Sequence, residues 1–202
     1  MNLHYTLQFH DYWHTGSGLS GGTYADQVVN KTHDKLPLVP GKTIKGLLRH
    51  AAEDLLELGD PAVSQETIDA LFGQRPEKRR LKDAERADNE GKPPPDPNRD
   101  AGSCWFSSAE LPAATASEIP KDQRDKLYEI LASTKISEKT GTAVDHSLRQ
   151  MEVTIPLTLT GYIAGATEAQ RVVLDRCLRY VKRLGQNRSR GLGRCTFKSI
   201  SA

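Results

Sequence analysis

The sequence predicts an α+β protein whose core elements follow the order βαββαβ, which is the order of a ferredoxin-like fold. Three observations lead to this prediction. Apolar and polar residues alternate near the start of the chain and in its second half, which indicates half-buried strands. Two other segments carry apolar residues at three-and-four spacing, which indicates amphipathic helices. These segments follow one another as strand, helix, strand, strand, helix, strand. The alternative is a general α+β domain whose strands pair differently.

The first strand is expected over Leu3–His10, where every second residue is apolar at the start of the run. A loop rich in glycine follows, with glycines at 16, 18, 21 and 22. Because glycine has no side chain, the backbone of this loop can approach a ligand closely. The segment Pro37–Gly41 is then expected to be a rigid extended turn, since its two prolines restrict the backbone.

Two helices are expected after this turn. Apolar residues recur at helical spacing from Ile44 to Leu56, and Gly59 is expected to end this helix. A shorter helix is expected from a cap at Ser64 to a stop at Gly73.

The second half of the chain contains the remaining core elements. Strands are expected over Gly102–Ala109 and Met151–Ile163, and the polar stretch Ser133–Gln150 between them is expected to be a long loop or an exposed hairpin. Thr167 is expected to cap a helix that Gly185 closes. The last strand is expected over Arg194–Ile200.

Composition restricts the class of protein. The 202 residues fit a single domain over 1–202, and the formal net charge of +2 does not by itself suggest a nucleic-acid partner. No apolar run has the roughly 18 residues of a membrane helix, the N-terminus has no signal pattern, and the three cysteines form no CxxC motif. We therefore expect a reduced, cytoplasmic protein without a membrane partner. The range 75–100 holds eight basic and seven acidic residues and five prolines, which predicts a flexible, disordered insertion.

Charge is concentrated in two stretches. Eight basic residues and no acid lie between Arg176 and Lys198, and five basic residues lie between Asn30 and His50 with Asp34 as the one acid. Each stretch includes glycine next to a helix end. Backbone amides combined with Lys or Arg form sites for phosphate groups, so the pattern favours a nucleic-acid interface. A solvated helix face is the simpler interpretation.

Three further features of the sequence bear on possible chemistry. Gly41-Lys42-Thr43 resembles the end of a P-loop, but Leu36 stands where that motif needs glycine. His14 is spaced from His10 like a metal ligand pair, although a structural or RNA-contacting role fits a strand end better. Asp26 follows the glycine loop, where a carboxylate beside a polyanion suggests a divalent metal or a general base. An ordinary loop aspartate is the alternative.

Several motifs resemble one family when taken in order. Residues 36–46, LPLVPGKTIKG, resemble the "PyIPGSSLKG" segment of RAMP proteins, and residues 184–193, LGQNRSRGLG, resemble their glycine-rich loop "lGgxgSRGyGrv". Between them, Leu71-Phe72-Gly73 and residues 102–109 are similar to "lFG…gxlxfsDA", and residues 139–149 are similar to "vaidRxTgtA". The match covers nearly the whole chain and is nearest to the repeated backbone subunit of type III CRISPR effector complexes.

The resemblance implies an RRM-like core that polymerises along guide RNA in a prokaryotic cytoplasm, with other effector subunits and copies of itself or homologous backbone subunits as neighbours. It implies that range 133–151 is a thumb hairpin that wedges between guide and target RNA. The RNA-binding residues implied or expected are Lys42, Thr43, Lys45, Arg49, Arg188, Ser189, Arg190, Gly191 and His14.

The resemblance also implies the chemistry. The active members cut target RNA beside each thumb with an aspartate and a divalent metal, so Asp26 is expected to be catalytic and to hold Mg²⁺ or Mn²⁺. Asp34 is the rival carboxylate, and His33 or His14 could assist. Two other functions remain open, namely a non-catalytic guide-RNA scaffold and a metal-independent ribonuclease that processes the guide.

Overall fold

A six-stranded antiparallel sheet forms the centre of the protein. The computed structural model describes residues 2–74 and 101–200, so the predicted insertion at 75–100 lies outside the described residues. The strands lie in the order β2-β4-β7-β1-β8, and β3 pairs with β7 beside β4. Their bounds are β1 Leu3–Phe9, β2 Leu38–Val39, β3 Trp105–Phe106, β4 Ala109–Glu110, β7 Thr158–Ala164 and β8 Cys195–Ile200.

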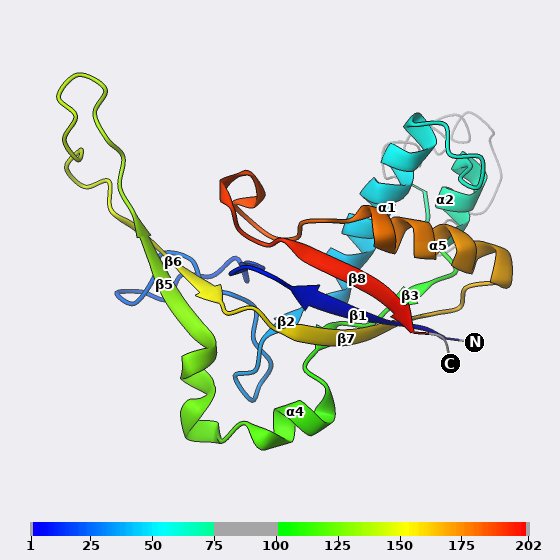
Figure 1. Cartoon of the computed structure of the whole chain (residues 1–202), viewed down its shortest axis with the longest axis horizontal. Coiled ribbons are helices and arrows are strands. Elements are labelled where there is room, and N and C mark those ends of the chain that lie inside the picture. The colour runs from blue at the N-terminus through cyan, green and yellow to red at the C-terminus, as the bar shows by residue number, and fades with distance from the viewer. Residues whose placement is uncertain (1, 75–100, 201–202) are drawn as a thin grey trace, which may run out of the picture.

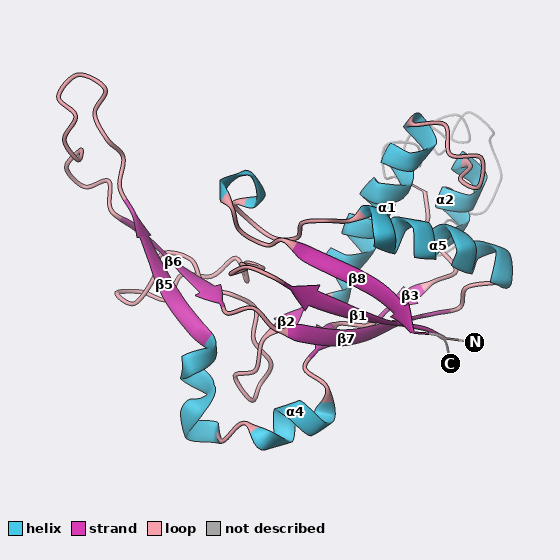
Figure 2. Cartoon of the chain, viewed as in Figure 1, coloured by secondary structure: helices cyan, strands magenta, loops and turns pink. Residues whose placement is uncertain are grey.

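The topology confirms the predicted ferredoxin-like fold. Helix α1 (Gly41–Glu57) connects β1 to the β3 and β4 side of the sheet, and α5 (Glu168–Tyr180) connects β7 to β8. The resulting strand order, with β1 and β7 at the centre, is that of a βαββαβ unit. Both helices lie on one side of the sheet together with α2 (Gln65–Phe72), as Figures 1 and 2 show. None of the described helices is long and apolar enough to cross a membrane.

The hydrophobic core lies between this sheet and its helices. The odd-numbered residues of β1, from Leu3 to Phe9, are buried, while the even-numbered ones are exposed or half-buried. The inward strand residues pack against the buried stripes of α1, which include Ile44 and Leu48, and of α5, which include Leu174. Alternation in the strand and helical spacing in the helices therefore describe the two sides of one core.

The strand predicted over Met151–Ile163 is two strands in two sheets, so that prediction was wrong. Strand β6 (Arg149–Thr154) pairs with β5 (Tyr128–Ser133), and β7 begins only at Thr158. Pro156 lies between them and has no amide proton to donate to a ladder. The apolar alternation continues through the break because side chains on both sides of it remain packed.

The helix predicted to close at Gly185 ends earlier. The backbone leaves the helical conformation at Val181, and Leu184 N donates to the carbonyl of Gly193 at 2.9 Å. Val181 and Leu184 are still buried, which is why the apolar stripe continues past the helix end. The strand predicted over 102–109 is likewise interrupted between β3 and β4, where Ser107 Oγ accepts a hydrogen bond from Tyr162 N at 2.8 Å.

Strands β5 and β6 form a hairpin that projects from the end of the sheet far from the termini (Figure 1). Its ladder reaches Ser133 opposite Arg149, so the ladder already begins before the expected range 133–151. Beyond the ladder, nearly all residues of 134–148 are exposed. The 3-10 helix η1 (Lys121–Leu127) and the short helix α4 (Ala113–Glu118) connect this hairpin to β4.

Candidate nucleic-acid interface

Asp26 lies at the foot of the β5–β6 hairpin. Its carboxylate Oδ2 accepts a hydrogen bond from Gln150 N at 2.7 Å, and its own amide donates to the Gln150 carbonyl at 2.8 Å. One residue further, the amide of Glu152 donates to the carbonyl of Gln27 at 2.9 Å. The loop after β1 therefore runs beside β6, and it holds an exposed carboxylate against the base of the hairpin.

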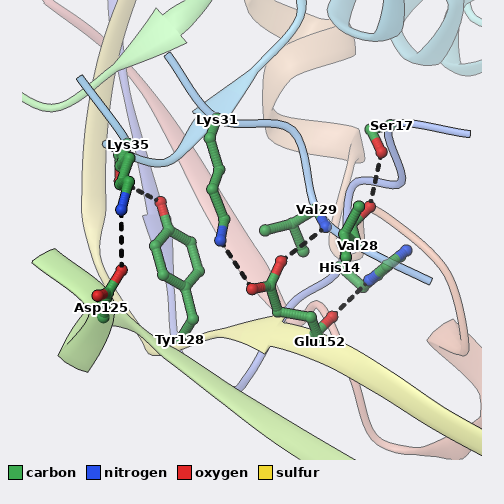
Figure 3. Close-up of polar contacts among 9 residues, drawn as sticks. All are labelled: His14, Ser17, Val28, Val29, Lys31, Lys35, Asp125, Tyr128 and Glu152. Atoms are coloured by element: carbon green, nitrogen blue, oxygen red, sulfur yellow. Dashed lines mark hydrogen bonds and ion pairs between the residues drawn. The ribbon is translucent and has the colours of Figure 1, made fainter. Parts of the chain in front are cut away.

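A buried ion pair fastens this loop to the hairpin (Figure 3). Glu152 is completely buried, and its Oε1 lies 2.7 Å from Lys31 Nζ. Its Oε2 accepts a hydrogen bond from Val29 N at 3.1 Å. The Lys31 ammonium also lies 3.8 Å from the centre of the Tyr128 ring, where the aromatic face attracts it. Burial raises the pKa of Tyr128, with Glu152 adding to the effect, so the phenol stays protonated.

Sequence reasoning missed this pair. In the sequence Lys31 is one of the five basic residues between Asn30 and His50, and Glu152 lies within the strand expected over Met151–Ile163. One sequence signal was present, since Glu152 is the only acid between Asp145 and Glu168. An isolated acid in an otherwise apolar strand is a candidate for a buried, paired carboxylate.

His14 is the second buried polar group at this place. Its Nδ1 lies 2.6 Å from the carbonyl oxygen of Glu152. A carbonyl oxygen only accepts, so Nδ1 carries the proton and donates it. The other ring nitrogen, Nε2, is buried and has no hydrogen-bond partner among the described residues. A side chain on Gly16 would begin 3.0 Å from Nε2, so glycine at this position keeps the space above the ring clear.

Two hollows meet at His14. The first has a volume of about 290 Å³ and is lined by the glycine loop and by Asp26. The second, of about 380 Å³, is lined by Lys42 and Thr43 at the start of α1 and by Arg188. Both hollows share His14, Gly16 and Gln186. The arrangement places an acidic and a basic site side by side, with the unpartnered ring nitrogen at their junction.

The glycine-rich loop forms a third, wider hollow of about 690 Å³. Arg188, Ser189 and Arg190, which form the 3-10 helix η2 (Arg188–Arg190), line it together with Arg149 from the hairpin. Gly191 follows η2 with φ of +90°, a conformation that glycine adopts without strain. The predicted loop residues are thus brought next to the hairpin base as well as to α1.

Two predicted RNA contacts lie elsewhere. Arg49 is bound to Glu53 at 3.1 Å and donates to the carbonyl of Gly73 at 3.0 Å, so it ties α1 to the end of α2. Lys45 lies on the side of α1 near Cys104, where its charge acts on the thiol. Neither residue lines the three hollows, and both stay predictions as RNA contacts.

The rival carboxylate lies outside the hollow that contains Asp26. Asp34 Oδ1 lies 3.4 Å from Arg124 Nη1 in an ion pair, and the Asp34 side chain is largely exposed. His33 is also exposed and lines none of the three hollows. Of the expected catalytic groups, the structure therefore brings Asp26 and His14 together.

The described residues fit a divalent metal only in part. They contain no group of three or more His, Cys, Asp or Glu side chains that could hold an ion. Asp26 is the one acid that lines the first hollow, where one of its oxygens holds Gln150 N. Mg²⁺ commonly binds through one or two carboxylates and completes its shell with water and substrate phosphates. Asp26 fits this mode of Mg²⁺ binding, in which RNA would supply further oxygens.

Comparison with known proteins gives a family and a fold. The family model of the RAMP superfamily matches residues 6–196. Two solved structures described as the type III-B Cmr-beta complex are similar to this chain. The one bound to cognate target RNA has a TM-score of 0.68 and 11% identity, and the match covers 98% of this chain and 97% of that one. The apo state has a TM-score of 0.65 and 11% identity, with 100% and 98% covered. No curated protein matches the chain.

Proposed function

The chain belongs to the RAMP superfamily, and from this premise we propose that it is a backbone subunit of a type III CRISPR effector complex that binds guide RNA and cuts complementary target RNA. The observation that carries the proposal is the position of Asp26. Its exposed carboxylate lies at the foot of the hairpin, and its hollow adjoins the basic one through His14. A strand of RNA bound across the two hollows would pass the carboxylate.

Binding would depend mainly on the phosphate backbone. Lys42 and Arg188 face one hollow, and Arg190 joins Arg188 and Arg149 in the next. Cations that replace the counterions of phosphates give binding that weakens steeply with salt. Base pairing between guide and target would supply the sequence specificity, as in other RNA-guided systems.

The proposed chemistry is attack by a ribose 2′-oxygen on the neighbouring phosphorus. The new P–O bond replaces the bond to the 5′-oxygen, which takes a proton from water as it leaves, and Asp26 afterwards returns its own proton to water. Asp26 accepts the proton of the 2′-hydroxyl through the carboxylate oxygen that does not bind Gln150. A bound Mg²⁺ or Mn²⁺ would neutralise charge on the phosphate oxygens. His14 is completely buried and donates from Nδ1 to the Glu152 carbonyl, so its proposed part is to hold the loop beside the hairpin.

The test replaces Asp26 by asparagine in a complex assembled with guide RNA. Asparagine keeps an oxygen that can accept from Gln150 N, so the loop should stay in place while the charge is lost. Cleavage of guide-matched RNA should fall by about 100-fold or more at the sites served by this subunit, which is the scale of general-base catalysis. RNA binding should stay within about twofold.

Asp34→Asn is the matched control, because it removes a carboxylate from the same loop outside the hollow. It should cut at the rate of the unaltered protein. Full cleavage by the Asp26→Asn complex would leave the scaffold function as the remaining alternative. Cleavage that persists in EDTA would instead favour a metal-independent processing ribonuclease.

A further inference from the structure

The face of the sheet opposite the helices carries a row of aromatic side chains. His4 of β1 is paired with Tyr162 of β7 in the strand register, and Trp105 of the adjacent β3 lies opposite Ala164. The Trp105 and Tyr162 ring centres are 5.3 Å apart, and those of Tyr162 and His4 are 5.6 Å apart. We refer to these three residues as the aromatic row. It crosses three neighbouring strands.

The row is open to solvent. Trp105 is 57% exposed, which is unusual for the largest side chain, and His4 is also exposed. The other tryptophan, Trp13, is completely buried against Phe9, as a core aromatic should be. An exposed aromatic surface on a sheet face has a cost in water unless a ligand covers it.

We propose that the aromatic row binds the bases of single-stranded RNA by stacking. Bases of any sequence stack on aromatic side chains, and sheet faces with aromatic rows present them in this way. The rest of the same face suits the edges and hydroxyl groups of nucleotides, because it carries Thr6, Gln8 and Thr160, with Ile200 as its exposed aliphatic residue.

The charge on this face is balanced, so the choice of RNA over a protein partner rests on how little exposed aliphatic surface the face carries. Among the six strands of this sheet, Lys198 is the one Lys or Arg and Glu110 is the one acid. An adjoining groove of about 990 Å³ shares His4 and Ile200 with this face, and each of the three arginines that line it forms an ion pair with an acid. Ile200 is the one exposed aliphatic residue on these strands, whereas the centre of a protein interface is usually richer in apolar surface.

The aromatic row is separate from the proposed catalytic site. His4 stands near the start of β1, and His14 follows the end of that strand. The five residue steps from His4 to Phe9 alone span about 17 Å of extended chain. The row would therefore hold a segment of RNA other than the one at Asp26, and the inference does not depend on cleavage.

The test measures tryptophan emission of the full-length protein during titration with a single-stranded oligouridylate. Trp105 is the exposed tryptophan, so stacking should quench a large part of the emission while buried Trp13 is unaffected. Trp105→Ala should raise the Kd for the oligonucleotide about tenfold, within the range that a stacked base contributes. Trp105→Phe should keep the affinity within about threefold because it keeps a ring.

Two controls separate the outcomes. Leu58→Ala removes an exposed apolar side chain, 72% exposed, from the end of α1 and should change neither quenching nor affinity. Arg188→Ala with Arg190→Ala weakens the proposed backbone site and should leave the quenching of Trp105 in place. Loss of the quenching in that double variant, or no quenching at saturating RNA, overturns the proposal. Quenching of Trp105 emission by another protein subunit instead of RNA also overturns the proposal.

Discussion

Replacing Lys31 by methionine should destabilise the protein strongly, although Lys31 is partly exposed. The change removes the ammonium 2.7 Å from Glu152 Oε1 and leaves a completely buried carboxylate without its ion-pair partner, although Val29 N still donates to it. Removing one partner of a buried ion pair typically costs about 3–5 kcal/mol. For a protein of this size that cost corresponds to a fall in Tm of roughly 6–20 °C.

Glu152→Gln should cost less than Lys31→Met. The Lys31 side chain is 28% exposed, so its ammonium can turn to water once the carboxylate is gone. The glutamine oxygen can still accept from Val29 N, and the expected cost is about 1–3 kcal/mol. The double variant should be more stable than Lys31→Met alone, because no charge is left buried. This order follows from which partner can reach solvent.

The assay is urea unfolding of the full-length protein, followed by circular dichroism. Lys35→Met is the matched control from the same loop, since Lys35 and Asp125 form an exposed pair at 3.9 Å with exposed fractions of 68% and 79%. Such a pair contributes about 0–1 kcal/mol. A Lys31→Met variant that loses no more free energy of unfolding than Lys35→Met would refute the argument that Glu152 is a buried, paired charge.

Three other results are expected. Gly185→Ala should destabilise the protein by about 1–3 kcal/mol in urea unfolding, because the φ of Gly185 is +102° and a methyl group there would overlap the backbone carbonyl of His14. Gly191→Ala should cost less, because Gly191 has a φ of +90° but open space around it. Burial raises the pKa of Cys177 and of Cys195 to about 12. An aromatic disulfide reagent at pH 8 should therefore label these two thiols only as fast as the chain unfolds. Labelling of these thiols within seconds would contradict this. Arg188→Ala should reduce the salt slope of RNA binding by about 0.7, and an unchanged slope would argue against a phosphate contact.

Local patterns in the sequence predicted most of the fold. The alternation of apolar and polar residues predicted β1, and helical spacing followed by a glycine predicted α1. Ser64 caps α2 as expected, because its side chain accepts a hydrogen bond from Thr67 N at 3.2 Å. These features depend on neighbours within a few residues, so a single sequence contains them. The errors came where the apolar pattern continued through a change of partner, as at Pro156 between β6 and β7.

The candidate site was predicted only in part, because its motifs are local in sequence while the partners of its side chains are not. The motif with Lys42 and the loop with Arg188 could be recognised in sequence, and the structure brings them to one hollow. Arg49 carries the same charge in the same stretch but is taken up by Glu53 and Gly73. Which face of a helix a basic side chain occupies is visible in spacing, whereas its actual partner is not.

The sequence by itself determined the order of the core strands and helices, the family resemblance and the two stretches of positive charge, because each depends on residues close together along the chain. Tertiary structure decided which distant groups meet. Glu152 lies more than 100 residues from Lys31, His14 and Asp26, yet the pairing of the loop with β6 places all four beside the hairpin. Burial then made one carboxylate a structural ion pair and left the other exposed at the foot of the hairpin. Contacts between distant parts of the chain decide how far each carboxylate is exposed to water, and this exposure decides whether the carboxylate is structural or available to a ligand.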